Sequence, residues 1–218
     1  GAVTASGTQT GSAGVTAVNA LGTATAGVVT ATVSGTAAEL ASLTTAGTDM
    51  IAVTVSNAHD LAKLKAINNA TGGTITLNDA SVALSGSAAD IAAALAGISG
   101  YTGAVAASGT QTGSSGVTAV NTLGAATSGV VTATASGTAA ELALLTTAGT
   151  DLIAVTLSNA HTLPQLKAIN DATGGAITLN DASVALSGTA ADINAALAGI
   201  SGYTGTVTAS GTQTGSSG

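Results

Sequence analysis

Residues 28–40 read Val-Val-Thr-Ala-Thr-Val-Ser-Gly-Thr-Ala-Ala-Glu-Leu, and this stretch decides the expected fold. Its first half alternates Val29, Ala31 and Val33 with polar residues, a period of two that predicts a strand buried on one face. Its second half, from Thr36 to Glu39, matches the capping box that begins a helix. The stretch therefore predicts a strand followed at once by a short helix.

This pattern recurs along the chain, each time with a serine, followed by Gly or Asn, at the end of the alternating run. The spacings between these serines are 28, 22, 29 and 23 residues, and the same four spacings then repeat. Segments of this length suit one strand and one short helix in each rung of a solenoid. The serines expected to mark equivalent places on the rungs are Ser6, Ser34, Ser56, Ser85, Ser108, Ser136, Ser158, Ser187 and Ser210.

A longer repeat of 102 residues contains four of these rungs. Residues 103–204 match residues 1–102 at 86 of 102 positions, and residues 205–218 begin a third copy. We expect two solenoid units of four rungs each, at 1–102 and 103–204, followed by the truncated start of another unit at 205–218. Because the sequence stops inside a copy, it is interpreted as an excerpt of a longer periodic chain.

Strands that alternate with short helices predict parallel strands joined by right-handed crossovers. The expected fold class is α/β: a right-handed β/α solenoid of 22–29-residue strand-plus-short-helix rungs with a parallel sheet. The alternative is a β-solenoid whose helical segments are only turns. The segment 15–21 is expected to be the weakest helix, because Gly14 and β-branched residues lower its propensity. Residues 74–84 are too many for one regular strand and predict a bulge, a corner or a tight hairpin at Asn78-Asp79.

Side chains that can cap the short helices follow the strands. The hydroxyl of a capping residue accepts a hydrogen bond from a first-turn amide, and an acid three residues later bonds back to the cap. Asn57 is expected to cap the helix that contains Leu61, Leu64 and Ile67, and Asn159 the equivalent helix of the second copy. The expected helix-capping residues are Thr36, Glu39, Asn57, Ser87, Asp90, Thr138, Glu141, Asn159, Thr189 and Asp192.

The composition excludes several classes of protein. Charged residues make up 6% of the chain, aromatic residues 1%, and the net charge is −7, with Lys63, Lys65 and Lys167 the only bases besides histidine. So few bases argue against nucleic acid as a partner, because a basic face is needed to neutralise phosphates. The absence of cysteine excludes disulfides and thiolate metal sites. No apolar run approaches the roughly 18–20 residues of a membrane-spanning helix.

The ionisable residues do not form a catalytic pattern. His59 and His161 occupy the same repeat position and are expected to be partly exposed residues in the first turn of a helix. Helix capping accounts for five of the ten acids, and turns or corners account for four more, so we expect no catalytic residues, no cofactor and no enzyme. A calcium ion would need six to eight oxygen ligands. The places where a structural calcium ion is considered are Asn78, Asp79, Asn180 and Asp181.

Three phrases carry a resemblance to a known class. They are Ser-Gly-Thr-Ala-Ala-Glu-Leu at 34–40 and 136–142, Gln-Leu-Lys-Ala-Ile-Asn at 165–170, and Ala-Leu-Ser-Gly-Ser/Thr-Ala-Ala-Asp-Ile at 83–91 and 185–193. In them the chain resembles tandem repeats of giant secreted cell-surface proteins of cyanobacteria and other bacteria, including motility-associated and adhesin-like ones. The resemblance implies an extracellular, cell-surface location and a structural or adhesive role. It supplies no catalytic residues.

The expected function is that of a structural repeat module of an extracellular filament, surface layer or giant cell-surface protein. Copies are expected to self-associate by rung stacking and lateral packing, because a surface of Ala, Thr and Ser suits close contact. The alternative is an adhesive or ice-binding module that uses outward threonines such as Thr30, Thr32 and Thr54. Exposed threonines, and Asn69 in an Asn-Ala-Thr sequon, are the places where glycans are expected.

Overall fold

The computed structural model describes residues 1–211, which form two compact units. The first unit comprises Gly1–Ala106 with Ala126–Gly129, and the second comprises Ala107–Ala125 with the chain from Val130 onward. Each unit alternates strands with helices, and its sheets are parallel. The α/β class predicted from the sequence is therefore confirmed.

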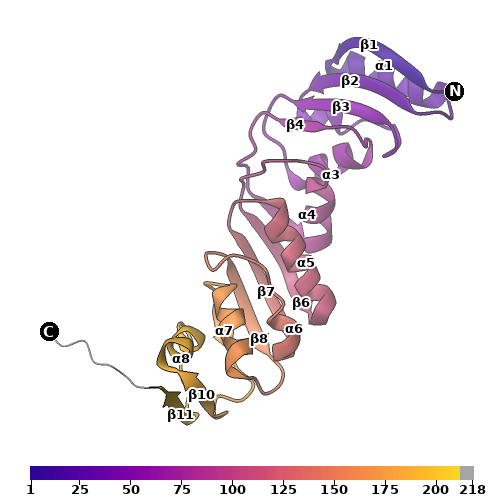
Figure 1. Cartoon of the computed structure of the whole chain (residues 1–218). Helices are drawn as coiled ribbons and strands as arrows, with labels where there is room; N and C mark the ends of the chain where they lie inside the picture. The colour runs from indigo at the N-terminus through magenta and orange to yellow at the C-terminus, as the bar shows by residue number, and fades with distance from the viewer. Residues whose placement is uncertain (212–218) are drawn as a thin grey trace. The chain divides into compact units, whose positions relative to one another are not determined.

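The first unit contains a four-stranded sheet whose strands follow one another in chain order, β1-β2-β3-β4 (Figure 1). All three pairings between neighbouring strands are parallel. The elements of this part are β1 (Val3–Thr10), α1 (Gly11–Ala24), β2 (Val29–Gly35), α2 (Ala37–Leu40), β3 (Met50–Val55), α3 (Leu61–Asn69), β4 (Ile75–Leu77), β5 (Leu84–Ser87) and α4 (Ala88–Leu95).

The second copy of the repeat gives the same succession of elements. In the second unit β7 pairs with β8 and β8 with β9, and β10 pairs with β11, in parallel throughout. The elements from residue 105 onward are β6 (Val105–Thr112), α5 (Gly113–Ala126), β7 (Val131–Gly137), α6 (Ala139–Leu142), β8 (Leu152–Leu157), α7 (Leu163–Asp171), β9 (Ile177–Thr178), β10 (Leu186–Thr189), α8 (Ala190–Leu197) and β11 (Val207–Ser210).

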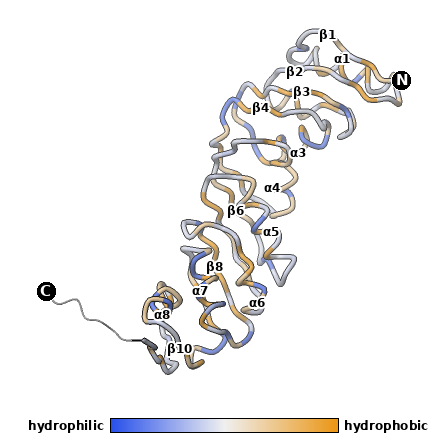
Figure 2. The backbone as a smooth tube through the Cα atoms, in the orientation of Figure 1, coloured by the Kyte–Doolittle hydropathy of each residue, from blue (hydrophilic) through white to orange (hydrophobic). Residues whose placement is uncertain are grey.

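The core of each unit lies between one face of its strands and the adjacent helices. Along β2 the buried and exposed residues alternate, so that Val29, Ala31 and Val33 face inward. Leu40 of α2 and Leu64 of α3 are fully buried as well. Burying a side chain of this size stabilises the fold by about 1.5–3 kcal/mol. Hydrophobic and near-neutral residues run along most of the backbone (Figure 2), so the core is distributed over many small side chains.

The marker serines do not lie opposite one another in the sheets. Ser34 lies opposite Thr10 and Thr54, rather than opposite Ser6 and Ser56. The expectation that these serines occupy equivalent places was wrong, because the register is set by the inward apolar side chains and not by the strand ends. The observed partners of Ser34 differ from the expected ones by an even number of residues, so the apolar side chains stay on the buried face of the sheet.

The same offset occurs at β10, where Ser187 lies opposite Thr208 rather than Ser210. The serines also differ in their position along the strands. Ser6 lies inside β1 and Ser85 inside β5, whereas Ser56 directly follows β3. A serine at the end of an alternating run in the sequence therefore need not lie at the end of a strand, as Ser6 and Ser85 show.

The helix expected to be the weakest is one of the two longest. α1 and the equivalent α5 each have 14 residues, and Val15 and Val18 of α1 are buried. A Cβ atom at Gly14 would lie 2.6 Å from the backbone carbon of Gln9. Glycine therefore lets the helix pack directly on β1, and this packing outweighs the low helix propensity of the segment.

The segment 74–84 is divided as the sequence predicted. β4 ends at Leu77, and β5 begins at Leu84. Between them the Asp79 carboxylate accepts hydrogen bonds from the backbone N–H of Ser81 at 2.8 Å and from its hydroxyl at 2.6 Å. This local turn is the corner, and Asp181 forms the same one with Ser183 in the second copy.

Candidate interaction surface

One face of the β1–β4 sheet is open and rich in threonine. The register places Thr10, Ser34, Thr54 and Thr76 in one row across the four strands. The three threonines of this row are exposed, and Ser34 is half-buried. Further along the strands, two more rows cross the same face: Thr8-Thr32-Ala52 and Thr4-Thr30-Met50.

The second unit repeats this open face on β7, β8 and β9. Thr156 lies between Ser136 and Thr178 in one row. Another row pairs Thr132 with Leu152, which is 51% exposed, as is Met50 in the first unit. Each open face therefore combines hydroxyl and methyl groups with one large exposed apolar side chain.

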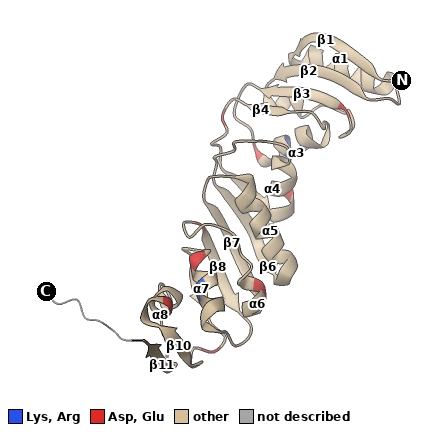
Figure 3. Ribbon diagram, in the orientation of Figure 1, with Lys and Arg blue, Asp and Glu red and all other residues tan. Residues whose placement is uncertain are grey.

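The strands that form these faces contain no charged residue. Lys, Asp and Glu lie on helices and in loops, and the strands in Figure 3 are free of both charge colours. Parallel sheets in soluble proteins are almost always covered on both faces. An uncharged parallel sheet with one open face is therefore the part of the described structure best suited to packing against another surface.

Buried threonines hold the strands and the turns together behind the open face. The Thr71 hydroxyl accepts hydrogen bonds from the N–H of Ile51 at 2.9 Å and of Gly73 at 2.8 Å. It also lies 2.7 Å from the carbonyl oxygen of Ile51, to which it donates. Thr71 is 3% exposed, and Thr173 makes the same bonds in the second unit. These residues were not predicted from the sequence, although the Thr-Gly-Gly that follows both α3 and α7 could have shown them.

Asparagine side chains link successive helices and turns. The Asn57 side-chain oxygen accepts a hydrogen bond from the N–H of Ala37 at 2.8 Å, at the start of α2. The prediction that Asn57 caps α3 was therefore wrong: Asp60 is the capping residue there, and its side chain accepts from the N–H of Lys63. Asn57 is three residues too early for its own helix, but lies beside the preceding one.

Asn159 follows Asn57 in the second unit, so its predicted role was wrong for the same reason. Its side-chain oxygen accepts from the N–H of Ala139 at 2.7 Å, at the start of α6. Thr162 is the capping residue of α7, where the Gln165 side chain bonds back to it. The two helices therefore begin differently: the Asp60 side chain accepts from a first-turn N–H, whereas the N–H and hydroxyl of Thr162 donate to the Gln165 side chain.

The other predicted caps lie at helix starts. Thr36 and Glu39 form a complete capping box at α2, and its bonds to the Thr36 backbone and side chain lower the pKa of the Glu39 carboxyl. Thr138 and Glu141 repeat this box at α6. Ser87 caps α4 by accepting from the N–H of Asp90, and Thr189 caps α8 by accepting from the N–H of Asp192.

The histidines differ from expectation. His59 is 6% exposed and His161 4% exposed, and both precede their helices instead of lying in the first turn. Neither ring nitrogen of either residue has a hydrogen-bond partner. Burial lowers the pKa of His59, although Asp79 and Asp60 oppose this shift. His59 packs at a tilt against Tyr101, with ring centroids 6.2 Å apart.

Tyr101 completes this buried group. Its hydroxyl donates a hydrogen bond to the carbonyl oxygen of Val82, and burial raises the pKa of Tyr101 to about 12. His161 and Tyr203 repeat the arrangement, with ring centroids 6.3 Å apart. The ring of His59 therefore packs against Tyr101 without an acid or nucleophile in hydrogen-bonding contact.

The acids do not gather into a site. Among residues 1–211, no group of three His, Cys, Asp or Glu side chains is arranged to hold a metal ion. Asp79 and Asp181, where calcium was considered, direct an oxygen to the turn that each stabilises. The three ion pairs, Lys63–Asp60, Lys65–Asp90 and Lys167–Asp171, are exposed on helices.

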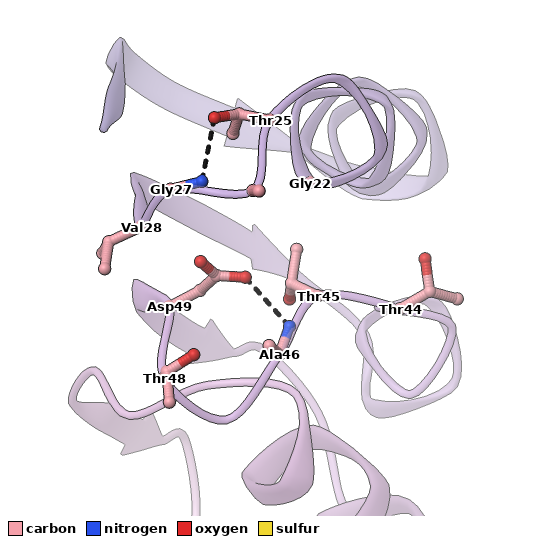
Figure 4. A pocket seen from close by; sticks show the side chains of 10 residues that line it. Gly22, Thr25, Gly27, Val28, Thr44, Thr45, Ala46, Thr48 and Asp49 are labelled. Carbon is pink, nitrogen blue, oxygen red and sulfur yellow. Dashed lines mark hydrogen bonds between the residues drawn. The ribbon is translucent and has the colours of Figure 1, made fainter. Parts of the chain in front are cut away.

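A pocket of about 300 Å³ lies between the end of α1 and the turn before β3 (Figure 4). Its carboxylate is already occupied: Asp49 accepts from the N–H of Val29 at 2.7 Å and of Ala46 at 2.9 Å. The Thr25 hydroxyl likewise accepts from the N–H of Gly27. These polar groups hold the backbone together and do not converge on a ligand.

No helix in the described part of the chain is long and apolar enough to cross a membrane. No protein-family model, curated protein or solved structure matches this chain.

Proposed function

We propose that this chain is a structural repeat module of an extracellular filament, surface layer or giant cell-surface protein, with no catalytic activity. In this proposal the parallel strands are successive rungs of a right-handed β/α solenoid. The observation that carries it is the uncharged open sheet face, which recurs in both units at equivalent residues. A face that is uncharged and repeated offers the same contact to each neighbouring molecule.

The side-chain hydrogen bonds behind the open face support a mechanical role. Thr71, Asn57 and their equivalents each join segments 20 residues apart in the sequence. These side-chain bonds therefore connect α2 to the segment before α3, and β3 to the turn after α3. Such links resist the separation of neighbouring rungs, because each separation breaks buried hydrogen bonds as well as apolar contacts.

The test is to place charge on the open face and compare it with charge elsewhere. Thr32→Glu with Thr134→Glu adds two carboxylates to exposed strand positions. Ala38→Glu with Ala140→Glu makes the same change in net charge on exposed helix positions. We expect the unmodified chain and the helix variant to form fibres or sheets in electron micrographs, and the strand variant to stay dispersed. Assembly that is equal in all three would refute the role of the face.

A second function rests on the threonines of the same rows. Hydroxyl and methyl groups that recur in register could order water, as an ice-binding or adhesive surface requires. Adjacent strands are about 4.8 Å apart and alternate side chains about 6.6–6.8 Å apart. Ala52 and Met50 interrupt the rows. An ice-recrystallisation assay decides this alternative, which fails if the chain and its Thr32→Glu, Thr134→Glu variant leave crystal growth equally unaffected.

A further inference from the structure

Each buried histidine is packed into a group with a tyrosine and the turn between two strands. His59 lies in the loop between β3 and α3, and its ring packs against Tyr101. The Tyr101 hydroxyl donates to the carbonyl oxygen of Val82, which lies in the corner between β4 and β5. We call His59, Tyr101 and the turn 78–82 the first corner cluster.

The turn of this cluster can move without the rest of the unit. Residues 78–83 belong to neither a helix nor a strand. Among the bonds that attach the turn, the carbonyl oxygen of Ala80 accepts from the N–H groups of Thr102 and Gly103, both at 2.9 Å. A segment held by a few bonds of this kind can open while the sheets and helices stay folded.

A proton on His59 would turn a neutral buried ring into a cation with two N–H donors. His59 is 6% exposed, and in the described part of the chain neither of its ring nitrogens has a hydrogen-bond partner. Tyr101 cannot balance the charge, because burial raises the pKa of Tyr101 to about 12 and keeps its hydroxyl protonated. Burying a charge without a partner is costly, so burial lowers the pKa of His59.

The two carboxylates that attract a proton to His59 are those of Asp79 and Asp60, and both already have partners. Asp79 accepts from the N–H and the hydroxyl of Ser81, and these bonds form the turn. Asp60 accepts from the N–H of Lys63 at 2.8 Å and forms an ion pair with the ammonium group of the same residue. A protonated ring must therefore draw Asp79 out of its turn or leave its buried place for water. Either movement breaks the packing that holds the turn.

We propose that each corner cluster is an acid-sensitive switch, in which a proton on the histidine releases the turn while the sheets and helices stay folded. The second corner cluster consists of His161, Tyr203 and the turn 180–184. The switch acts below the ordinary histidine pKa of about 6.5, since the closed ring resists a proton that the released ring accepts. It is a property of each unit by itself, so it does not depend on the proposed function.

The two copies differ in the charge beside the histidine. Asp60 follows His59, whereas the uncharged Thr162 follows His161. The Asp60 carboxylate favours the charged form of His59 and so brings the pKa of the closed ring nearer to that of the released ring. A proton then favours release less. We therefore expect the turn of the second corner cluster to be released more than that of the first at the same acid pH.

Hydrogen exchange of the full chain, followed by NMR at about pH 7.5 and about pH 5, tests the switch. The rates are corrected for the intrinsic dependence of amide exchange on pH. The reporters are the N–H groups that bond to the carbonyl oxygens of Ala80 and Ala182, those of Thr102, Gly103, Thr204 and Gly205. We expect their protection to fall severalfold in acid, and to fall more for the two that bond to Ala182. The N–H groups of Val53 and Val155, which lie in the sheets, should keep their protection.

Two charge variants at exposed positions test the difference between the clusters. Thr162→Asp should reduce the acid response of the second turn to that of the first. Asp60→Asn keeps a side-chain acceptor at the start of α3 and should increase the response of the first turn. Asp90→Asn is the matched control, because it makes the same change in net charge and likewise leaves a lysine, Lys65, without its ion pair. Equal effects of Asp60→Asn and Asp90→Asn would overturn the role of the carboxylate beside the ring.

His59→Phe gives an independent measurement, because phenylalanine keeps a ring against Tyr101 and cannot take up a proton. It should abolish the acid response of the first turn and leave that of the second unchanged. A response that persists in His59→Phe, or turn amides whose protection does not fall in acid, would overturn the switch. Equal losses at the turn and sheet amides would also overturn it, because the whole unit would then be unfolding. Each of these outcomes leaves the proposed function standing.

Discussion

Replacing Thr71 with valine tests the bonds that hold the strands to the turns. Valine has nearly the same shape but cannot accept a hydrogen bond, so the N–H groups of Ile51 and Gly73 lose their acceptor. Each buried group left without a partner costs about 1–3 kcal/mol. The extra methyl group returns less than about 1 kcal/mol. We therefore expect Thr71→Val to lower the free energy of unfolding by about 2–4 kcal/mol.

The assay is urea unfolding followed by far-ultraviolet circular dichroism, since the chain has no tryptophan. With a urea dependence of about 2 kcal/mol per molar, the expected loss lowers the unfolding midpoint by about 1–2 M. Thr54→Val is the matched control, because Thr54 is exposed on the open face. Its effect should stay within about 0.5 kcal/mol.

Repeat proteins can unfold in parts, so the double variant Thr71→Val, Thr173→Val is measured as well. The double variant should shift the whole unfolding transition to lower urea. Each single variant should shift only the part of the transition in which its own unit unfolds. If Thr71→Val and Thr54→Val had equal effects, the buried hydroxyl would not be holding the strand, and the reasoning would be refuted.

Three further predictions follow from other contacts. The lowered pKa of His59 and His161 means that the unfolded chain binds protons first as the pH falls below about 6.5; stability should therefore decrease from about pH 7 to 5. Replacing both histidines with phenylalanine should remove this slope in thermal melts, and an unchanged slope would contradict it. Asn57→Ala should cost about 1 kcal/mol in urea unfolding, because the start of α2 loses its acceptor; no change would show that water replaces it. Gly14→Ala should destabilise the chain by about 1–3 kcal/mol despite its better helix propensity, because the new Cβ collides with β1, whereas Thr16→Ala in the same helix should be close to neutral.

The alternating runs and capping boxes were sufficient to predict the class of fold. Val29, Ala31 and Val33 of β2 alternate with exposed residues as expected, and β2 pairs in parallel with both of its neighbours. These features are local, because an alternating run and a capping box can each be recognised within a few consecutive residues. The proposed solenoid, its handedness and the boundaries of the units at residues 102 and 204 stay predictions.

Contacts between distant segments could not be predicted in the same way. Asn57 lies near its own helix in the sequence but bonds to the helix before it, and Thr71 bonds to a strand 20 residues earlier. Gly14 looked unfavourable for a helix because its advantage, close contact with Gln9, exists only after the strand and helix have packed. The pairing register of the strands was also not predicted. A shift of one strand by an even number of residues leaves the alternating pattern unchanged, so only the packing of the side chains selects the observed register.

The side-chain bonds that join one segment to another span only about a quarter of the 102-residue period, from 19 residues at Tyr101 to 28 at Asn68. Unequal recombination between the two nearly identical copies would therefore add or delete 102 residues while leaving a full set of partners at every junction. We therefore expect that a gene that encodes such a chain can vary in length without an accompanying loss of stability. We expect natural variants to differ by whole multiples of this period.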